Sequence, residues 1–272
     1  MAIITATITI TQATTPIEDM HMTDLHSHIL PGIDDGAKDQ NVSASLLQAQ
    51  LSSGVTQVAC TPHFYFERQT IEEFCQKRDA AKQVLFHYCA AELENITVQV
   101  GAEVLFSPGL LELDLKPLCM ENTSLMLVEL PTSYYPLWTC DVLYRLGGLG
   151  VVPLIAHVER YPYVMENPNL LLDWISAGAY TQVNATSLVQ HKKRKERILK
   201  MIRHRLIHVI ATDTHSLVKR PPLMGQAITL IEKNCGTQIA QEMCTCADAL
   251  FAGEAPEQPE ATAMKQLFGH IF

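Results

Sequence analysis

The sequence contains no hydrophobic run long enough to cross a membrane. No stretch of its 272 residues approaches the ~18 apolar residues that a membrane-spanning helix needs. The apolar N-terminal region also lacks a basic residue ahead of its apolar part, which disfavours a secretory signal. Acidic residues outnumber basic ones, and the net charge of -9 disfavours nucleic acid as the main partner. We therefore expect a cytoplasmic protein that has no membrane span and binds no nucleic acid.

The sequence also lacks the motifs of several catalytic classes. Its eight cysteines are scattered without paired spacings, so reduced thiols are expected. Cysteine-dependent hydrolysis of phosphotyrosine needs an arginine six residues after the cysteine, and Arg145 follows Cys140 one position too early. There is no G-x-S-x-G elbow, no Walker loop and no G-x-G-x-x-G after the first predicted strand. These absences disfavour covalent cysteine or serine catalysis and a dinucleotide-binding fold.

What recurs along the chain is a short apolar or β-branched run followed by a turn and a helical pattern. The predicted strands are residues 22–26, 57–61, 96–104, 124–130, 151–157, 180–184 and 206–212. Helices are predicted at residues 41–53, 71–93, 167–177, 188–205, 222–235 and 237–250, and Thr70 with Glu73 forms a plausible capping box for the second. This alternation predicts an α/β domain of parallel strands with outer helices, arranged as a closed or nearly closed seven-stranded (β/α) barrel.

Histidines and carboxylates stand at the ends of six of the seven predicted strands. They are His26 and His28, His63, Glu103, Glu129, His157, and Asp213 with His215. Taken singly, each is better explained as an ordinary polar residue at the end of a strand than as a metal ligand. In a parallel barrel, however, the loops after the carboxyl ends of the strands converge on one mouth. His26 and His28 also share one face of their strand, so both can contact one ion. The pattern as a whole predicts a metal cluster.

Four segments together resemble a known family. They read DLHSHILPGIDDGA at residues 24–37, TPH at 61–63, AHVERY at 156–161 and TDTH at 212–215. The chain resembles the PHP (polymerase and histidinol phosphatase) superfamily from about residue 23 to 222. Within it, the first segment is typical of the bacterial manganese-dependent protein tyrosine phosphatases of the CpsB/CapC type. The resemblance implies a distorted seven-stranded barrel, up to three metal ions and a role in capsule or exopolysaccharide synthesis. The implied substrate is the tyrosine-rich tail of a bacterial tyrosine kinase.

The resemblance also implies roles for individual residues. The implied metal ligands are His26, His28, His63, Glu103, Glu129, His157, Asp213 and His215, with Asp35 as an acidic position beside them. Arg160 and Arg220 match arginines that bind the phosphate, and Asp213 is expected to serve in catalysis as well. Val158, Ala102 and Thr212 depart from the usual residues without removing a ligand. A mixed set of imidazoles and carboxylates accommodates manganese, iron or zinc, and its carboxylates favour manganese. Together with the resemblance, this gives an expectation of two or three manganese ions.

Other interpretations remain open at this point. The chain could hydrolyse a small phosphate monoester such as histidinol phosphate, or be a catalytically silent metal-binding regulator. Arg160 could instead form a structural ion pair with Glu159 or with a neighbouring residue. The basic residues within 191–197 are either a solvated helix face or an attractor for an acidic, phosphorylated tail.

Domain boundaries are predicted as well. Residues 1–22 are expected to form a leader or an edge strand, 23–253 a single barrel domain, and 254–272 a linker with an apolar end. That end is expected to dock on the barrel, and an oligomer is possible.

Overall fold

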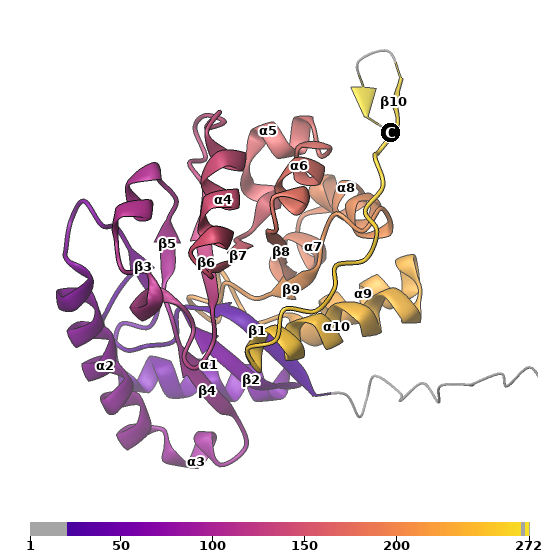
Figure 1. The fold of residues 1–272 in the computed structure, drawn as a ribbon. Coiled ribbons are helices and arrows are strands. Elements are labelled where there is room, and N and C mark those ends of the chain that lie inside the picture. The colour runs from indigo at the N-terminus through magenta and orange to yellow at the C-terminus, as the bar shows by residue number, and fades with distance from the viewer. Residues whose placement is uncertain (1–20, 268–269, 272) are drawn as a thin grey trace, which may run out of the picture.

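Strands in the interior of the molecule are surrounded by helices (Figure 1). The computed structural model describes residues 21–267 and 270–271, so residues 1–20 of the leader or edge strand expected at 1–22 lie outside the described residues. The strands that frame the site are β1 (Met22–Ser27), β2 (Val55–Cys60), β3 (His63–Phe64), β4 (Thr97–Val100), β5 (Glu103–Leu105), β6 (Leu125–Glu129), β7 (Val152–Ile155), β8 (Tyr180–Asn184) and β9 (Val209–Ala211). Every pair among these strands that is joined by a ladder is parallel. The prediction of an α/β fold with parallel strands is therefore confirmed.

The described strands form two main sheets, with the orders β1-β2-β4 and β3-β5-β6-β7-β8-β9. The predicted strand at 96–104 is split in two, and β3 is a short strand just beyond the predicted strand at 57–61. Pro62, which has no N–H to donate to a ladder, separates β2 from β3, and Gly101 with Ala102 separates β4 from β5. One isolated bridge, Ser27 to Thr214, links β1 to the segment after β9. The ladders thus do not close into one ring, and the predicted seven-stranded barrel is not confirmed.

Ten helices are assigned among the described residues, most of them on the outside of the strands (Figure 1). They are α1 (Gln40–Ser52), α2 (Ile71–Tyr88), α3 (Ala90–Leu93), α4 (Thr139–Gly148), α5 (Pro162–Glu166), α6 (Leu170–Ser176), α7 (Ala185–Val189), α8 (Lys192–Arg203), α9 (Met224–Cys235) and α10 (Thr237–Phe251). The predicted capping box is confirmed, because the Thr70 hydroxyl accepts from Glu73 N and the Glu73 carboxylate accepts from Thr70 N. The sequence patterns did not predict α4, and α8 is separated from α7 by a break at Gln190 and His191.

Large apolar side chains from the helices and strands form the core. Trp174, Tyr161, Phe64, Phe74 and Phe106 are among the largest fully buried side chains. Burying such side chains is the main favourable term in folding and holds the helices against the strands. No helix of the described residues has the length and apolar character needed to cross a membrane.

The segment after α10 lies along the outer elements of the fold (Figure 1). Thr262 N donates to His204 O at 2.9 Å, and the Asn169 side chain both donates to Met264 O and accepts from Met264 N. These contacts hold residues up to 264 against α6 and α8. Beyond them, β10 (Gln266–Leu267) and β11 (His270–Ile271) pair antiparallel. The expected docking of the apolar end involves residues 268, 269 and 272, which lie outside the described residues.

Candidate metal centre and phosphate-binding arginines

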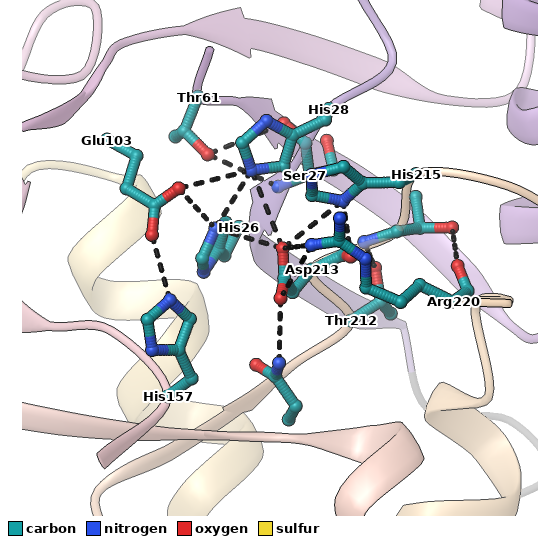
Figure 2. Close-up of polar contacts among 12 residues, drawn as sticks. His26, Ser27, His28, Thr61, Glu103, His157, Thr212, Asp213, His215 and Arg220 are labelled. Atoms are coloured by element: carbon teal, nitrogen blue, oxygen red, sulfur yellow. Dashed lines mark hydrogen bonds and ion pairs between the residues drawn. The ribbon is translucent and has the colours of Figure 1, made fainter. Parts of the chain in front are cut away.

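The histidines and carboxylates at the strand ends come together in one cluster (Figure 2). His26 lies on β1, His63 starts β3, Glu103 starts β5 and Glu129 ends β6. The others follow strands directly: His28 after β1, His157 after β7, and Asp213 with His215 after β9. His26, His28, Glu103, His157, Asp213 and His215 are buried, whereas His63 and Glu129 are partly exposed. Parallel pairing explains part of this convergence, because His63 and Glu103 are direct partners in the β3–β5 ladder.

The paired histidines of the first motif point their ring nitrogens at each other. His26 Nε2 and His28 Nε2 are 3.1 Å apart, and Glu103 Oε2 lies 3.3 Å from each of them. Asp213 Oδ1 lies 3.5 Å from each of the same two nitrogens. Donor atoms at these separations are spaced like neighbouring ligands around one ion with bonds of ~2.1 Å.

Histidines contact both carboxylate oxygens of Glu103 (Figure 2). Its Oε1 is 2.9 Å from His157 Nε2, and its Oε2 is 2.9 Å from His63 Nδ1. Glu129 Oε1 approaches the same His157 nitrogen at 3.4 Å. A carboxylate in this position can bridge two ions.

Three groups of donor atoms in the described residues are compact enough to hold an ion each. They are His28, Asp35, His63 and His215; His26, His28 and Asp213; and His63, Glu103 and Glu129. His28 and His63 belong to two groups each, so the groups form one continuous cluster. The buried atoms Glu103 Oε2, His63 Nδ1 and His215 Nε2 make only ion-pair contacts inside the cluster, and His157 Nδ1 has no hydrogen-bond partner among the described residues. Because leaving buried polar atoms unpaired is costly, this donor set fits divalent metal ions well.

Opposite charges dominate the electrostatics of the cluster. Burial lowers the pKa of His28, but the hydrogen bonds and negative charges of Asp34 and Glu103 outweigh burial and raise it to about 10. Burial raises the pKa of Glu103, yet the positive charge on His26 brings it well below its usual range. Burial and the nearby His28 lower the pKa of His215 to about 4. Glu103 is therefore held ionised in a buried site, which favours a bound cation, whereas burial and the negative charge of Glu103 raise the pKa of Glu129.

Three polar residues that were not predicted as site residues fix the orientation of the candidate ligands. Asp34 Oδ2 accepts from His28 Nδ1 at 2.7 Å, which leaves Nε2 facing the cluster. On β8, Gln182 Oε1 accepts from His157 N at 2.7 Å and lies 3.3 Å from His26 Nδ1. Asn184 accepts from Gln182 Nε2 and donates to Asp213 Oδ2, both at 2.8 Å. Partners of this kind set the tautomer and direction of metal-binding side chains.

Two candidate ligands have a strained backbone. His157 has φ 31° and Asp213 has φ 50°, both in the left-handed region that non-glycine residues seldom adopt. Such strain is concentrated at functional sites, where the surrounding structure holds it in place. Here the hydrogen bonds from His157 N to Gln182 Oε1 and from Asp213 N to His26 O hold these residues.

The loop of the first motif folds back onto the histidine that precedes it. Ala37 N donates to His28 O at 3.0 Å, and Gly36 N donates to Asp34 Oδ1 at 2.9 Å. A Cβ at Gly36 would lie 2.1 Å from His28 O, so the close approach requires glycine. This loop also carries Asp35, whose Oδ1 lies 3.4 Å from His63 Nε2 and 3.2 Å from His215 Nε2 although the side chain is largely exposed.

Both predicted arginines reach the edge of the cluster and meet at Asp213. Arg160 Nη1 donates to Asp213 Oδ2 at 3.2 Å, and Arg220 Nη1 lies 3.3 Å from Asp213 Oδ1. Arg220 Nη2 also donates to Asp35 Oδ2 at 3.2 Å. The Glu159 carboxylate accepts instead from Asn184 N and the Ser187 hydroxyl, so the expected structural alternative, a pair between Arg160 and Glu159, is not what the structure shows. Both guanidinium groups remain about one-third exposed, at 38% and 32%.

Fold and site together are those of an α/β metal-dependent hydrolase, with a buried imidazole and carboxylate cluster at the carboxyl ends of parallel strands. The chain belongs to the CpsB/CapC family of capsular polysaccharide synthesis, whose family model matches residues 22–250. The resemblance expected from the sequence motifs is thus confirmed.

Named relatives and a solved structure agree with this assignment. The tyrosine-protein phosphatase CpsB of Streptococcus pneumoniae is 32% identical over 239 residues, covering 82% of this chain and 94% of its own. The tyrosine-protein phosphatase YwqE of Bacillus subtilis is 29% identical over 255 residues, which cover 91% of this chain and 99% of the length of YwqE. A crystal structure from work on these two proteins, described as unique metal-dependent tyrosine phosphatases, superposes with a TM-score of 0.80 at 26% identity. It covers 90% of this chain and 100% of its own.

Proposed function

We propose that this chain is a cytoplasmic, metal-dependent protein-tyrosine phosphatase that acts on phosphotyrosine in a bacterial tyrosine kinase controlling capsule or exopolysaccharide synthesis. The observation that carries the proposal is the convergence of Arg160 and Arg220 on Asp213, at the edge of the donor cluster. Two guanidinium groups, each about one-third exposed beside a metal centre, provide a place for a phosphate group. The named relatives are tyrosine phosphatases, which supports this choice among phosphoesterases.

In this proposal the donor cluster holds two or three divalent ions, with manganese as the native metal. The ligands are His26, His28, His63, Glu103, Glu129, His157, Asp213 and His215, and Asp35 assists from the rim. When bound, such ions activate water at neutral pH and neutralise negative charge on the phosphate. The chain supplies the fixed positions of the ligands through Asp34, Gln182 and Asn184. The single bridge between β1 and the segment after β9 supports a distorted, nearly closed barrel as the scaffold.

The arginines bind and orient the phosphate. Each planar guanidinium can donate two parallel hydrogen bonds to phosphate oxygens, which a lysine cannot. Asp213 keeps both arginines at the mouth before substrate arrives, so little ordering is needed on binding. Tyrosinate is a good leaving group, since the pKa of its conjugate acid is ~10, and it departs with little help from a general acid. This chemistry suits an aryl phosphate better than an alkyl one.

The cysteines do not offer an alternative nucleophile. All eight are free, and burial raises the pKa of each thiol, to about 12 for Cys60, Cys244 and Cys246. A thiol with a raised pKa holds little of the reactive thiolate at neutral pH. We expect iodoacetamide to leave the activity intact and EDTA to remove it.

The deciding assay compares a phosphotyrosine peptide with histidinol phosphate, each with manganese and with chelator. The expected result is manganese-dependent hydrolysis of the peptide and little turnover of histidinol phosphate. Faster turnover of histidinol phosphate would instead assign the chain to small monoesters. No turnover of either compound by metal-loaded protein would indicate a silent metal-binding regulator.

A further inference from the structure

Exposed apolar side chains gather in two loops beside the candidate metal centre. One is the β6 loop, defined here as residues 131–138, and the other is the β9 loop, residues 216–220. Of the nine large hydrophobic side chains that are exposed in the described residues, four belong to these loops. They are Tyr134 (55% exposed), Leu137 (90%), Leu217 (50%) and Val218 (85%). Single exposed apolar residues are ordinary, but two pairs next to one site call for an explanation.

Strand order places the two loops on different sides of the cluster. The β6 loop starts two residues after Glu129, and the β9 loop starts directly after His215. In the larger sheet β7 and β8 lie between β6 and β9 (Figure 1), and β7 leads into His157 and Arg160. Because all these strands are parallel, both loops extend from the carboxyl ends, where the donor cluster lies. A chain that crosses the mouth can therefore touch both loops.

The backbone of each loop is fixed even though its apolar side chains are exposed. In the β6 loop Tyr163 donates from its hydroxyl to Pro131 O at 2.9 Å, and the Tyr135 ring packs 5.3 Å from the Tyr163 ring. In the β9 loop the Thr214 hydroxyl donates to Arg220 O at 2.8 Å, and Lys219 N donates to the Ser216 hydroxyl at 3.1 Å. Apolar groups on a rigid frame lose little entropy when they bind, which is typical of prepared recognition surfaces.

We propose that the β6 and β9 loops bind apolar residues on either side of the phosphotyrosine, so that the substrate peptide lies across the mouth. This rests on the proposed function and narrows the substrate to phosphotyrosine segments with apolar flanking residues. An extended peptide advances ~3.3 Å per residue, so residues two and three positions away lie ~7–10 Å from the phosphotyrosine. The β9 loop ends at Arg220, so one rigid loop contacts both the phosphate and the flanking residue. A small aryl phosphate has no flanking residues and gains nothing from either loop.

The test uses two double variants and a matched control. L217S/V218S alters the β9 loop, and Y134S/L137S alters the β6 loop. The control is Y144S/L149S, which changes a comparably exposed pair, at 74% and 56%; Tyr144 lies in the middle of α4 and Leu149 directly after it, six and eleven residues beyond the β6 loop. The substrates are p-nitrophenyl phosphate, a phosphotyrosine peptide with leucine two and three positions away on both sides, and the same peptide with serine at those positions.

We expect each loop variant to lower kcat/KM for the leucine peptide by ~10-fold, mainly through KM, since each lost apolar contact is worth a fold-change of that order. Turnover of p-nitrophenyl phosphate should stay unchanged, and the control should match the native protein on all substrates. An equal loss on p-nitrophenyl phosphate would overturn the proposal, because the loops would then only support Arg220. Unchanged kinetics on the leucine peptide would also overturn it.

Two further outcomes separate this proposal from others. If the native protein forms a dimer in size-exclusion chromatography that both loop variants break while peptide kinetics stay unchanged, the loops bind a second copy of the chain and the proposal is wrong. If the native protein hydrolyses p-nitrophenyl phosphate but neither phosphotyrosine peptide, the proposed function itself fails. Preference for the leucine peptide over the serine peptide, lost in both loop variants, would support the proposal.

Discussion

Two buried carboxylates near the same strand ends, Asp24 and Glu103, have opposite surroundings. Asp24 accepts hydrogen bonds from neutral donors: Gln50 Nε2 at 2.6 Å, Thr212 N at 2.9 Å, the Thr212 hydroxyl, and His26 N at 3.3 Å. Glu103 is instead surrounded by the imidazoles of His26, His28, His63 and His157, which contact its two carboxylate oxygens.

The difference shows how a structural carboxylate can be told from a functional one. Fixed neutral donors satisfy Asp24, which joins β1, α1 and the segment after β9. The imidazoles around Glu103 can take up a proton or bind a metal ion. The negative charge of Glu103 is therefore neutralised only when protons or metal ions are present. Burial alone does not separate them, because both carboxylates are buried.

The largest expected effect is the loss of turnover when residues of the cluster around Glu103 are replaced. We expect His26→Ala and Asp213→Ala each to abolish turnover, because each removes a donor from the shared cluster. The metal-free proteins should unfold at nearly the native temperature, since metal linkage and not core packing is lost. Activity assays and circular dichroism with chelator test this. A folded variant that keeps its activity would contradict the assignment of these residues as ligands.

A smaller effect is expected from Arg160→Lys. The charge stays, but the planar fork is lost, so we expect turnover of aryl phosphates to fall by ~10²–10³. Metal content should stay normal because a guanidinium does not bind cations. Steady-state kinetics show whether the loss lies in kcat, as a clamp that tightens in the transition state requires, or in KM. Unchanged kcat and KM would show that Arg160 only forms an ion pair with Asp213.

Replacing Asp24 is expected to lower the stability of the fold. Asp24→Ala leaves donors of Gln50 and Thr212 without a partner, at a cost of about 1–3 kcal/mol for each buried group left unpaired. Asp24→Asn keeps one acceptor oxygen and serves as the control with the smaller loss. Thermal unfolding in EDTA measures both. If Asp24→Ala is as stable as the native chain, the contrast between the two carboxylates is wrong.

The smallest expected effect concerns a buried histidine outside the cluster. Burial lowers the pKa of His208 to about 4, and its Nδ1 accepts from Thr181 N at 3.1 Å. Below pH ~6.5 the unfolded chain protonates this histidine, whereas the folded protein keeps His208 neutral. Proton uptake by the unfolded chain alone lowers the free energy of unfolding, so His208 costs no stability above pH ~6.5. The free energy of unfolding should fall by at most about 1.4 kcal/mol per pH unit as the pH drops toward 4.

Denaturant unfolding between pH 7 and 4 tests this prediction. His208→Gln should flatten the pH dependence relative to the native chain. An equal pH dependence in His208→Gln and the native protein would show that His208 does not titrate as expected.

The sequence predicted which residues gather at the strand ends, because a residue that follows a parallel strand lies at the same edge of the sheet as the residues that follow the other strands. The parallel alternation of strands and helices brings His26, His63, Glu103 and His157 to one mouth, whatever the exact length of each strand. The roles of Gln182 and Asn184 depend on where their side chains point from β8, which no spacing reveals. Asp34 was visible beside Asp35, but only the return of the loop onto His28 shows which of the two holds the imidazole.

Other features depend on packing that the patterns do not contain. Pro62 ends β2 as the predicted strand at 57–61 implies, but the two-residue strand β3 that follows it is too short for a sequence pattern to show. Closure of a sheet depends on the tilt and register of all its strands, so the two separate sheets could not be predicted from the individual runs. The exposed pairs in the β6 and β9 loops resemble ordinary apolar residues until their place beside the site is known.

The central claim is that the cluster around Glu103 is a centre for two or three metal ions. Its most direct test is the metal content of protein that has been stripped with chelator, reloaded with manganese and freed of excess ion, measured by mass spectrometry. We predict two or three manganese ions per chain in the native protein and fewer in His28→Ala, which removes a donor shared by two of the three groups. Less than one ion per chain in folded native protein, or the same content in His28→Ala, would contradict the claim.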